Sequence, residues 1–186
     1  MKRVFDVVLA ILIGMLALLP CLVIAILVRV TSRGPAIYWS NRIGQDNKNF
    51  RMPKFRSMRS GTPAIATHLL DNAKSHMTPI GKFLRKSSCD ELPQLWSVLI
   101  GDMSLVGPRP ALSNQHDLIA LRTEHGVHRL RPGITGWAQI NGRDELAIPA
   151  KVKLDVEYLN RQSILLDMRI LWLTIFRSLL QEGVSH

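Results

Sequence analysis

The feature that most constrains this chain is an uncharged and strongly apolar run at residues 7–28. Asp6 ends the run on one side, and Arg29 ends it on the other. A straight helix of this length would measure about 33 Å, which is enough to cross the hydrocarbon core of a bilayer. A secretory signal peptide would have a shorter apolar region and small residues at a cleavage site. Residues 29–33 (RVTSR) make a poor cleavage site, so the run predicts a membrane-embedded segment.

Pro20 lies inside this run and predicts a kink or a break in the helix. Proline removes one helical hydrogen bond and clashes with the preceding turn. The two pieces would be about 20 Å and 12 Å long, and neither would span a bilayer alone. Both ends carry basic residues, which favour the cytoplasmic face: Lys2, Arg3, Arg29 and Arg33. Two paths stay open, a re-entrant hairpin with both ends on one side and a kinked transmembrane helix that separates residues 29–186 from the N-terminus.

The rest of the chain carries the charge. Of 186 residues, 24 are Lys or Arg and 14 are Asp or Glu, and nearly all of the net charge of +10 lies in residues 29–186. This charge indicates an anionic partner: nucleic acid, anionic lipid or a phosphorylated substrate. Cys21 and Cys89 are the two cysteines, which excludes a disulfide framework and suits a reducing compartment. The chain thus divides into a membrane segment at residues 1–30 and a basic body at residues 31–186 that lies next to it.

This domain is predicted to be mainly α with short β segments, in an α/β-type arrangement. A short strand is expected at 36–40 and a polar turn at 44–49. Hydrophobic spacing predicts helices at 79–86, 88–100, 111–124, 149–162 and 164–180. Gly101 is typical of a helix end.

The last of these helices has one apolar stripe. Its members are Leu165, Met168, Leu171, Trp172, Ile175, Phe176 and Leu179. Such a stripe is equally typical of a helix that packs on a core and of an amphipathic helix that lies in the membrane interface. The spacing does not separate these two interpretations.

Asp90 and Glu91 are adjacent carboxylates at the expected start of the 88–100 helix. The spacing of Ser88 and Glu91 matches a capping box, and acidic residues suit the positive end of a helix dipole. Spacing alone favours that structural interpretation. The functional alternative notes the basic residue Arg85 nearby, because a helix N-terminus binds phosphate and a carboxylate there can hold Mg²⁺ or attack phosphorus.

Two further groups could bind phosphate. Prolines on both sides of Arg109 restrict its backbone, and a rigidly presented guanidinium suits a pair of phosphate oxygens. Arg143 closes the glycine-rich stretch at residues 131–143, where turns can aim backbone N–H groups at an anion.

The six histidines form no convincing metal pattern. Neither a basic helix nor an aromatic RNA-binding motif is present. We therefore expect no nucleic-acid partner.

Taken together, the ordered motifs of the chain resemble the bacterial sugar transferase family, the monotopic polyprenyl-phosphate phosphoglycosyl transferases. The matching segments are Lys2-Arg3-x-Phe5-Asp6, Ser32-x-Gly34-Pro35, Lys54-Phe55-Arg56-Ser57-Met58, residues 90–96 (DELPQLW), residues 101–110 (GDMSLVGPRP), residues 131–139 (RPGITGWAQ) and Asn141-Gly142-Arg143, followed by Asp155, Tyr158 and Asp167. Each motif is weak alone, but their ordered combination covers nearly the whole chain and is highly specific.

The resemblance implies transfer of a phospho-sugar from a nucleoside diphosphate sugar to polyprenyl (undecaprenyl) phosphate, an initiating membrane step of a bacterial glycan pathway. It implies that Asp90 is the nucleophile, that a covalent phospho-sugar intermediate forms, and that Glu91 assists. It also implies Mg²⁺ held at Asp90 and Glu91. The residues expected to face phosphate or nucleotide are Arg85, Arg109, Arg143, Lys54 and Arg56.

For the membrane segment, the resemblance implies a re-entrant helix broken at Pro20, in the bacterial inner membrane, with the catalytic domain on the cytoplasmic face. Membrane lipid is then a partner, and a homo-oligomer is allowed. A different class of function, a non-catalytic membrane-attached scaffold of a glycan assembly complex, predicts no release of nucleoside monophosphate. A membrane-anchored nucleic-acid binder would instead show salt-sensitive duplex binding.

Overall fold

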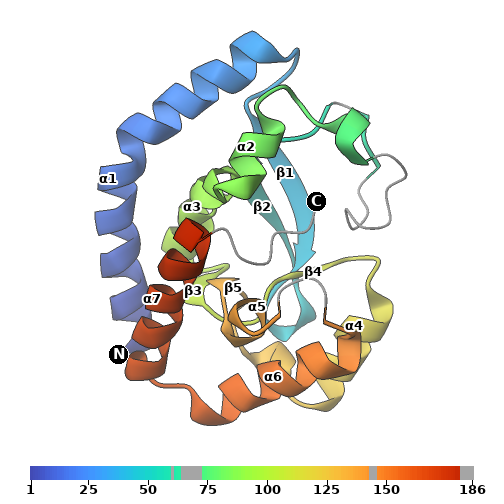
Figure 1. The fold of residues 1–186 in the computed structure, drawn as a ribbon. Helices are drawn as coiled ribbons and strands as arrows, with labels where there is room; N and C mark the ends of the chain where they lie inside the picture. Colours follow the sequence, from blue (N-terminus) through green and yellow to red (C-terminus); the bar gives the residue numbers. More distant parts are fainter. Residues whose placement is uncertain (60, 64–72, 143–145, 181–186) are drawn as a thin grey trace.

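The computed structural model describes residues 1–59, 61–63, 73–142 and 146–180, and Figure 1 shows the fold. Its α-helices are α1 (Lys2–Thr31), α2 (Gly81–Lys86), α3 (Leu95–Ile100), α4 (His116–Glu124), α5 (Trp137–Ile140), α6 (Ile148–Arg161) and α7 (Ile164–Leu180). The strands are β1 (Ile37–Ile43), β2 (Asn49–Phe55), β3 (Ser104–Val106), β4 (Ala111–Leu112) and β5 (Gly133–Thr135). Short 3₁₀ helices are η1 (Gln45–Asn47), η3 (Ala73–His76), η4 (Cys89–Gln94) and η5 (Val127–Arg129). The prediction of a mainly helical chain with short strands is confirmed.

Helix α1 contains the apolar run and is long and apolar enough to cross a membrane by length and composition. It continues through Pro20 without an interruption of the helix, although its axis bends part-way along (Figure 1). Its buried residues, which recur at intervals of four and seven, form one stripe: Asp6, Ala10, Ala17, Ile24 and Val28. The helix therefore lies against the body along one edge and presents its other faces outward.

Both ends of α1 are hydrogen-bonded to the body. At the start, Lys2 Nζ donates to Asp167 Oδ2 of α7 at 2.7 Å, and Arg3 donates to the carbonyl oxygens of Val98 and Leu99 at the end of α3. At the other end, the guanidinium of the buried Arg56 donates to carbonyl oxygens of the two residues after the helix, at positions 32 and 33. The helix thus arches along one side of a single folded body (Figure 1).

The first sheet is built on a hairpin. β1 and β2 are antiparallel, with Ile37 opposite Phe55 and Ile43 opposite Asn49, and η1 forms the predicted polar turn between them. β4 pairs with the other edge of β1, which gives the order β2-β1-β4. The strand expected at 36–40 is confirmed and is longer than expected. β2 was not predicted, because Pro53 and the charged residues around it hide the alternation of a strand.

Three clusters of buried apolar residues hold the elements together. The largest joins α1, α3, β3, α6 and α7, with Met103, Tyr158 and Ile170 among its most buried side chains. The second joins the later half of α1 to β2, α2 and η4, and the third joins β4, α4 and α6. Cys89 and Leu92 of η4 pack against this second cluster, so η4, which carries the adjacent carboxylates, is held against the later half of α1.

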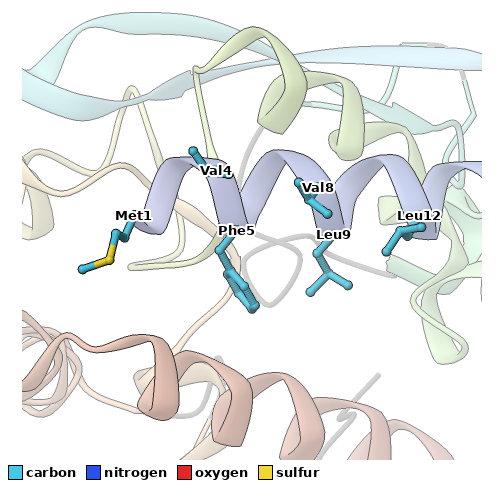
Figure 2. A pocket seen from close by; sticks show the side chains of 6 residues that line it. All are labelled: Met1, Val4, Phe5, Val8, Leu9 and Leu12. Atoms are coloured by element: carbon cyan, nitrogen blue, oxygen red, sulfur yellow. The ribbon is translucent and has the colours of Figure 1, made fainter.

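The apolar stripe on α7 faces outward. Leu165, Met168, Trp172, Ile175 and Phe176 are all exposed, with Trp172 at 69%. The described part of the stripe is therefore not mainly a core face. A groove runs along the first turns of α1, where Phe5 and Leu9 point toward α7 (Figure 2). The six residues that line the groove are Met1, Val4, Phe5, Val8, Leu9 and Leu12.

Candidate active site

The adjacent carboxylates lie on η4, a 3₁₀ helix, and not at the start of an α-helix as predicted. Ser88 adopts a left-handed backbone (φ 56°) before η4, and Pro93 inside η4 has no N–H to donate to a residue one α-turn back. The α-helix therefore begins at Leu95, and it ends at Gly101 as expected. Successive residues of a 3₁₀ helix are about 120° apart, so the side chains of Asp90 and Glu91 diverge.

The capping box suggested by the spacing is not formed. Ser88 makes no side-chain cap hydrogen bond, and Glu91 turns to other partners. Lys54 Nζ on β2 donates to Glu91 Oε1 at 2.7 Å, and Arg109 Nη2 donates to the same oxygen at 3.2 Å. The structure thus brings together two of the predicted phosphate-binding residues, and one carboxylate links them.

The same two cations determine the charge of Glu91. Burial alone would raise its pKa, but the charges and hydrogen bonds of Lys54 and Arg109 more than offset this effect and lower the pKa to about 2. Glu91 is therefore ionised throughout the neutral range. It holds two cations in place and carries no proton to donate there.

Asp90 has a different environment. It is 7% exposed, and the described hydrogen bonds of the Lys54 and Arg109 side chains go to Glu91 instead. Burial raises the pKa of Asp90 to about 6; Glu91 adds to this rise, while Lys54, Arg85 and Arg109 oppose it. At neutral pH most of the Asp90 carboxylate is ionised and buried, and it lies in the field of Lys54, Arg85 and Arg109, whose described hydrogen bonds go to Glu91 and Ser57.

Arg85 reaches this region from α2, and Gly81 allows it to do so. A Cβ on Gly81 would lie 2.0 Å from the carbonyl oxygen of Ser57, so only glycine lets the first turn of α2 pack this closely on the segment after β2. One turn later, Arg85 Nε donates to Ser57 Oγ at 3.3 Å. Burial raises the pKa of Asp90, and the charge of Arg85 partly opposes this rise; a phosphate-binding role for Arg85 stays a prediction.

The loop that carries Arg109 leaves β3 and is fixed through its carbonyl groups. The Gly133 N–H donates to the Pro108 carbonyl at 2.9 Å, Arg122 Nη1 donates to the Arg109 carbonyl at 2.8 Å, and Arg42 Nη1 donates to the Pro110 carbonyl at 3.2 Å. Two of the loop residues are prolines and have no N–H to donate. Accepting hydrogen bonds at consecutive carbonyls is therefore the way in which this loop is held.

Arg56, another predicted phosphate-binding residue, makes its described contacts outside this cluster. The buried guanidinium of Arg56 donates to Ser32 Oγ and to the carbonyl groups of Ser32 and Arg33, so its described contacts fasten the end of α1. Arg143 lies outside the described residues. A phosphate-binding role for either residue stays a prediction.

The comparisons with known proteins agree with the motifs. The family model described as "Bacterial sugar transferase" matches residues 1–181. The chain belongs to the bacterial sugar transferase family. One relative, the undecaprenyl-phosphate glucose phosphotransferase of Komagataeibacter xylinus, is 42% identical over 98% of this chain and 36% of its own length.

Two other relatives differ in length. The UDP-glucose:undecaprenyl-phosphate glucose-1-phosphate transferase of Escherichia coli (strain K12) is 39% identical over 98% of this chain and 41% of its own length. The uncharacterized sugar transferase EpsL of Bacillus subtilis (strain 168) is 41% identical over the whole chain and 91% of its own length. The chain thus spans about two fifths or less of the two named glucose transferases and nearly all of EpsL.

The bacterial sugar transferase site offers few protein ligands to a metal. Within the described residues, no group of three or more His, Cys, Asp or Glu side chains is placed to hold one. Mg²⁺ is commonly held by one or two carboxylates together with substrate phosphates. Asp90 fits that pattern as a buried, largely ionised carboxylate, whereas Oε1 of Glu91 is already occupied by Lys54 and Arg109.

The residues that support the site from behind belong to no recognisable functional motif. Arg122 and Arg42 hold the loop of Arg109, yet each is a single arginine in an ordinary pattern and gives no sequence signal. Of the glycines in the 131–143 stretch, Gly133 lies on β5 and lets that strand approach the residue after β3 closely, since a Cβ on Gly133 would lie 2.1 Å from the Gly107 nitrogen.

Proposed function

We propose that this chain transfers a phospho-sugar from a nucleoside diphosphate sugar to undecaprenyl phosphate, giving undecaprenyl diphosphate-sugar and a nucleoside monophosphate. The observation that carries the proposal is the state of Asp90. It is a buried and mostly ionised carboxylate among three cations, and its immediate neighbour Glu91 takes the direct bonds of two of them. The names of relatives support the substrates, because they include transferases for UDP-glucose and UDP-N-acetylgalactosamine acting on undecaprenyl phosphate.

The proposed reaction has two displacements. An oxygen of Asp90 attacks the phosphorus that carries the sugar, and the bond from that phosphorus to the nucleotide's bridging oxygen breaks, so that nucleoside monophosphate leaves with the electron pair. An oxygen of undecaprenyl phosphate then attacks the same phosphorus, and the Asp90 carboxylate leaves. The covalent intermediate lets one site serve a water-soluble donor first and a lipid acceptor second.

The cations around Asp90 have a role in both displacements. Negative charge shifts onto the leaving phosphate oxygens as each bond breaks, and preorganised positive groups stabilise this charge. Lys54 and Arg109 are held in place by Glu91 before any substrate binds, so little reorganisation is needed. Arg85 adds a third positive group from α2.

Mg²⁺ is part of the proposal as a partner of Asp90 and the donor diphosphate. When bound, it would supply neutralisation of the diphosphate and polarisation of its oxygens. Glu91 is proposed to act by holding Lys54 and Arg109 rather than by handling a proton, because its pKa is about 2.

We further propose that α1 is re-entrant and that the body lies on the cytoplasmic face of the bacterial inner membrane. Both ends of α1 are bonded to one folded body, which suits a helix that enters and leaves one face of a bilayer. The exposed apolar faces of α1 and α7 would cost about 25 cal/mol for each Å² left in water, so contact with lipid stabilises them. In this arrangement α7 lies in the interface, and the site faces the lipid phosphate.

The experiment is a donor screen with the purified protein in detergent or lipid nanodiscs. UDP-glucose, UDP-galactose and UDP-N-acetylgalactosamine are each supplied with undecaprenyl phosphate and Mg²⁺. We expect UMP release that depends on the acceptor, together with a lipid product heavier by one phospho-sugar. Donor alone is expected to add one phospho-sugar to the intact mass of the wild-type protein and none to Asp90→Asn.

The outcomes separate the proposal from a scaffold. A scaffold would release no UMP with any donor, and Asp90→Asn would support glycan assembly as well as the wild type does. UMP release without a mass increase on the protein would keep the transferase and remove the covalent step.

A further inference from the structure

The loop of Arg109 is fixed by a buried ion pair that lies behind it. Arg122 on α4 is 8% exposed and Asp155 on α6 is 2% exposed. Nε and Nη2 of Arg122 both donate to Asp155 Oδ2, at 2.9 and 2.7 Å. The remaining nitrogen, Nη1, donates to the Arg109 carbonyl at 2.8 Å. One guanidinium thus joins a carboxylate on α6 to the backbone of the residue that contacts Glu91.

The geometry of this guanidinium couples the position of Asp155 to the position of the Arg109 carbonyl. Arginine is planar, and its donors diverge at fixed angles, so anchoring Nε and Nη2 on Asp155 fixes where Nη1 lies. The packing of α4 on α6 and of β4 on both helices holds this pair from behind, through Leu118, Val152 and Ala111. The Arg109 carbonyl therefore has a rigid donor, although the Arg109 side chain itself remains 38% exposed.

We propose that Arg122, held by Asp155, is a positioning residue for Arg109 in the transfer reaction. This inference rests on the proposed function, because Arg109 is assigned there to the donor phosphates. Arg122 and Asp155 touch neither Asp90 nor Glu91 in the described contacts. They act by setting the backbone from which the Arg109 guanidinium reaches Glu91 and the substrate.

The test is a double-mutant cycle on the kinetics of the donor. Asp155→Asn keeps the shape of the side chain but leaves Arg122 without its counter-charge. A misplacement of about 1 Å at a positioning group can cost about 100-fold in rate, so we expect kcat/KM for the donor to fall about 10- to 100-fold. In an Arg109→Ala background, the same change is expected to lower kcat/KM by no more than about twofold, because the group that it positions is gone.

The cycle separates positioning from simple destabilisation. If Asp155→Asn lowers kcat/KM by the same factor with and without Arg109, the pair does not act through Arg109 and the proposal is overturned. Arg122→Lys is the second variant: its ammonium can keep the charge pair with Asp155 but has no fixed fork to reach the carbonyl as well. It is expected to show the same dependence on Arg109. Glu157→Gln, another carboxylate on α6 that bonds Trp137 and Arg161, is the matched control and should leave kcat/KM unchanged.

A failure of the proposed function itself is recognisable. If the wild type releases no UMP with any donor, the transferase assignment fails, and the same cycle is then measured on the affinity for UDP by calorimetry. Coupling between Asp155→Asn and Arg109→Ala in UDP affinity would still support the positioning pair. Additive effects would overturn it.

Discussion

Lys54 on β2 and Glu91 on η4 are joined by an ion pair of 2.7 Å between Nζ and Oε1, and this pair explains how two neighbouring carboxylates come to differ. Glu91 accepts the direct bonds of Lys54 and Arg109 and is ionised even in acid. Asp90 lies in the field of these cations, whose described hydrogen bonds go to Glu91, and burial raises the pKa of Asp90 to about 6. The two adjacent residues thus differ in environment: Glu91 holds two cations, and Asp90 is the carboxylate that we propose attacks phosphorus.

The first prediction concerns the stability of Asp90→Asn. The pKa of Asp90 in the folded chain lies above its ordinary value of 3.8, so the stability that the protonated group gives at low pH is lost as the pH rises through about 6. Above that pH the buried charge lowers the free energy of unfolding by about 3 kcal/mol. Asparagine removes this cost, so Asp90→Asn should abolish phospho-sugar transfer yet unfold at an equal or higher temperature than wild type at pH 7.5. A variant that is inactive because it is less stable would contradict this explanation.

The second prediction is the pH dependence of donor turnover. Attack requires ionised Asp90, so kcat/KM should rise about tenfold per pH unit below pH 6 and level off above it. Lys54 lowers the pKa of Asp90 and Glu91 raises it. Lys54→Gln should therefore move the inflection to higher pH, and Glu91→Gln should move it to lower pH, whatever each change does to the maximal rate. Shifts in the same direction in both variants would show that Asp90 is not the group that titrates.

Much of the fold was accessible from sequence, because the information was local. Apolar spacing predicted α6 and α7 to within one residue at each end, and Gly101 marked the end of α3. The start of α3 was missed because the spacing from Leu92 to Leu99 ignores Pro93, which cannot donate one helical hydrogen bond. The capping box failed for a long-range reason: Lys54 lies 37 residues away, and only the packing of β2 on η4 brings it to Glu91.

The residues of the site divide in the same way: those in local motifs could be predicted, and those that depend on long-range contacts could not. The resemblance located Asp90, Glu91 and Arg109 by motif. It also assigned Arg56 to phosphate, which stays a prediction, and the contact of Arg56 with the end of α1 came only from the structure. An arginine's sequence neighbours do not reveal whether it bonds a ligand or a carbonyl group. Arg122 has no motif, and its contact with the Arg109 carbonyl exists only in the folded chain.

The third prediction concerns the contacts that hold the start of α1 on the body. The hydroxyl of the buried Tyr158 donates to Asp167 Oδ1 at 2.7 Å, and Asp167 Oδ2 accepts from Lys2. Burial and the nearby Asp167 raise the pKa of Tyr158, so it remains a donor over the whole working range. Tyr158→Phe leaves half of this carboxylate unbonded and should cost about 1.5 to 3 kcal/mol in the free energy of unfolding.

The measurement for this variant is chemical unfolding in detergent micelles. Tyr38→Phe is the matched control, since Tyr38 is 46% exposed on β1, and it should change the free energy of unfolding by less than about 0.5 kcal/mol. Equal effects of the two changes would mean that the contact between Tyr158 and Asp167 does not hold the start of α1.

The last prediction concerns the path of α1. If both ends are bonded to one body on the cytoplasmic face, a cysteine just ahead of Met1 and a cysteine at Arg33→Cys should be accessible from the same side. The background carries Cys21→Ser and Cys89→Ser, and the extension before Met1 is a few polar residues. A membrane-impermeant maleimide is expected to label both cysteines in inside-out vesicles and neither in intact spheroplasts. Labelling of the two cysteines from opposite sides would establish a transmembrane path, and the contacts of Lys2 with Asp167 and of Arg56 with Ser32 could then not form in one chain.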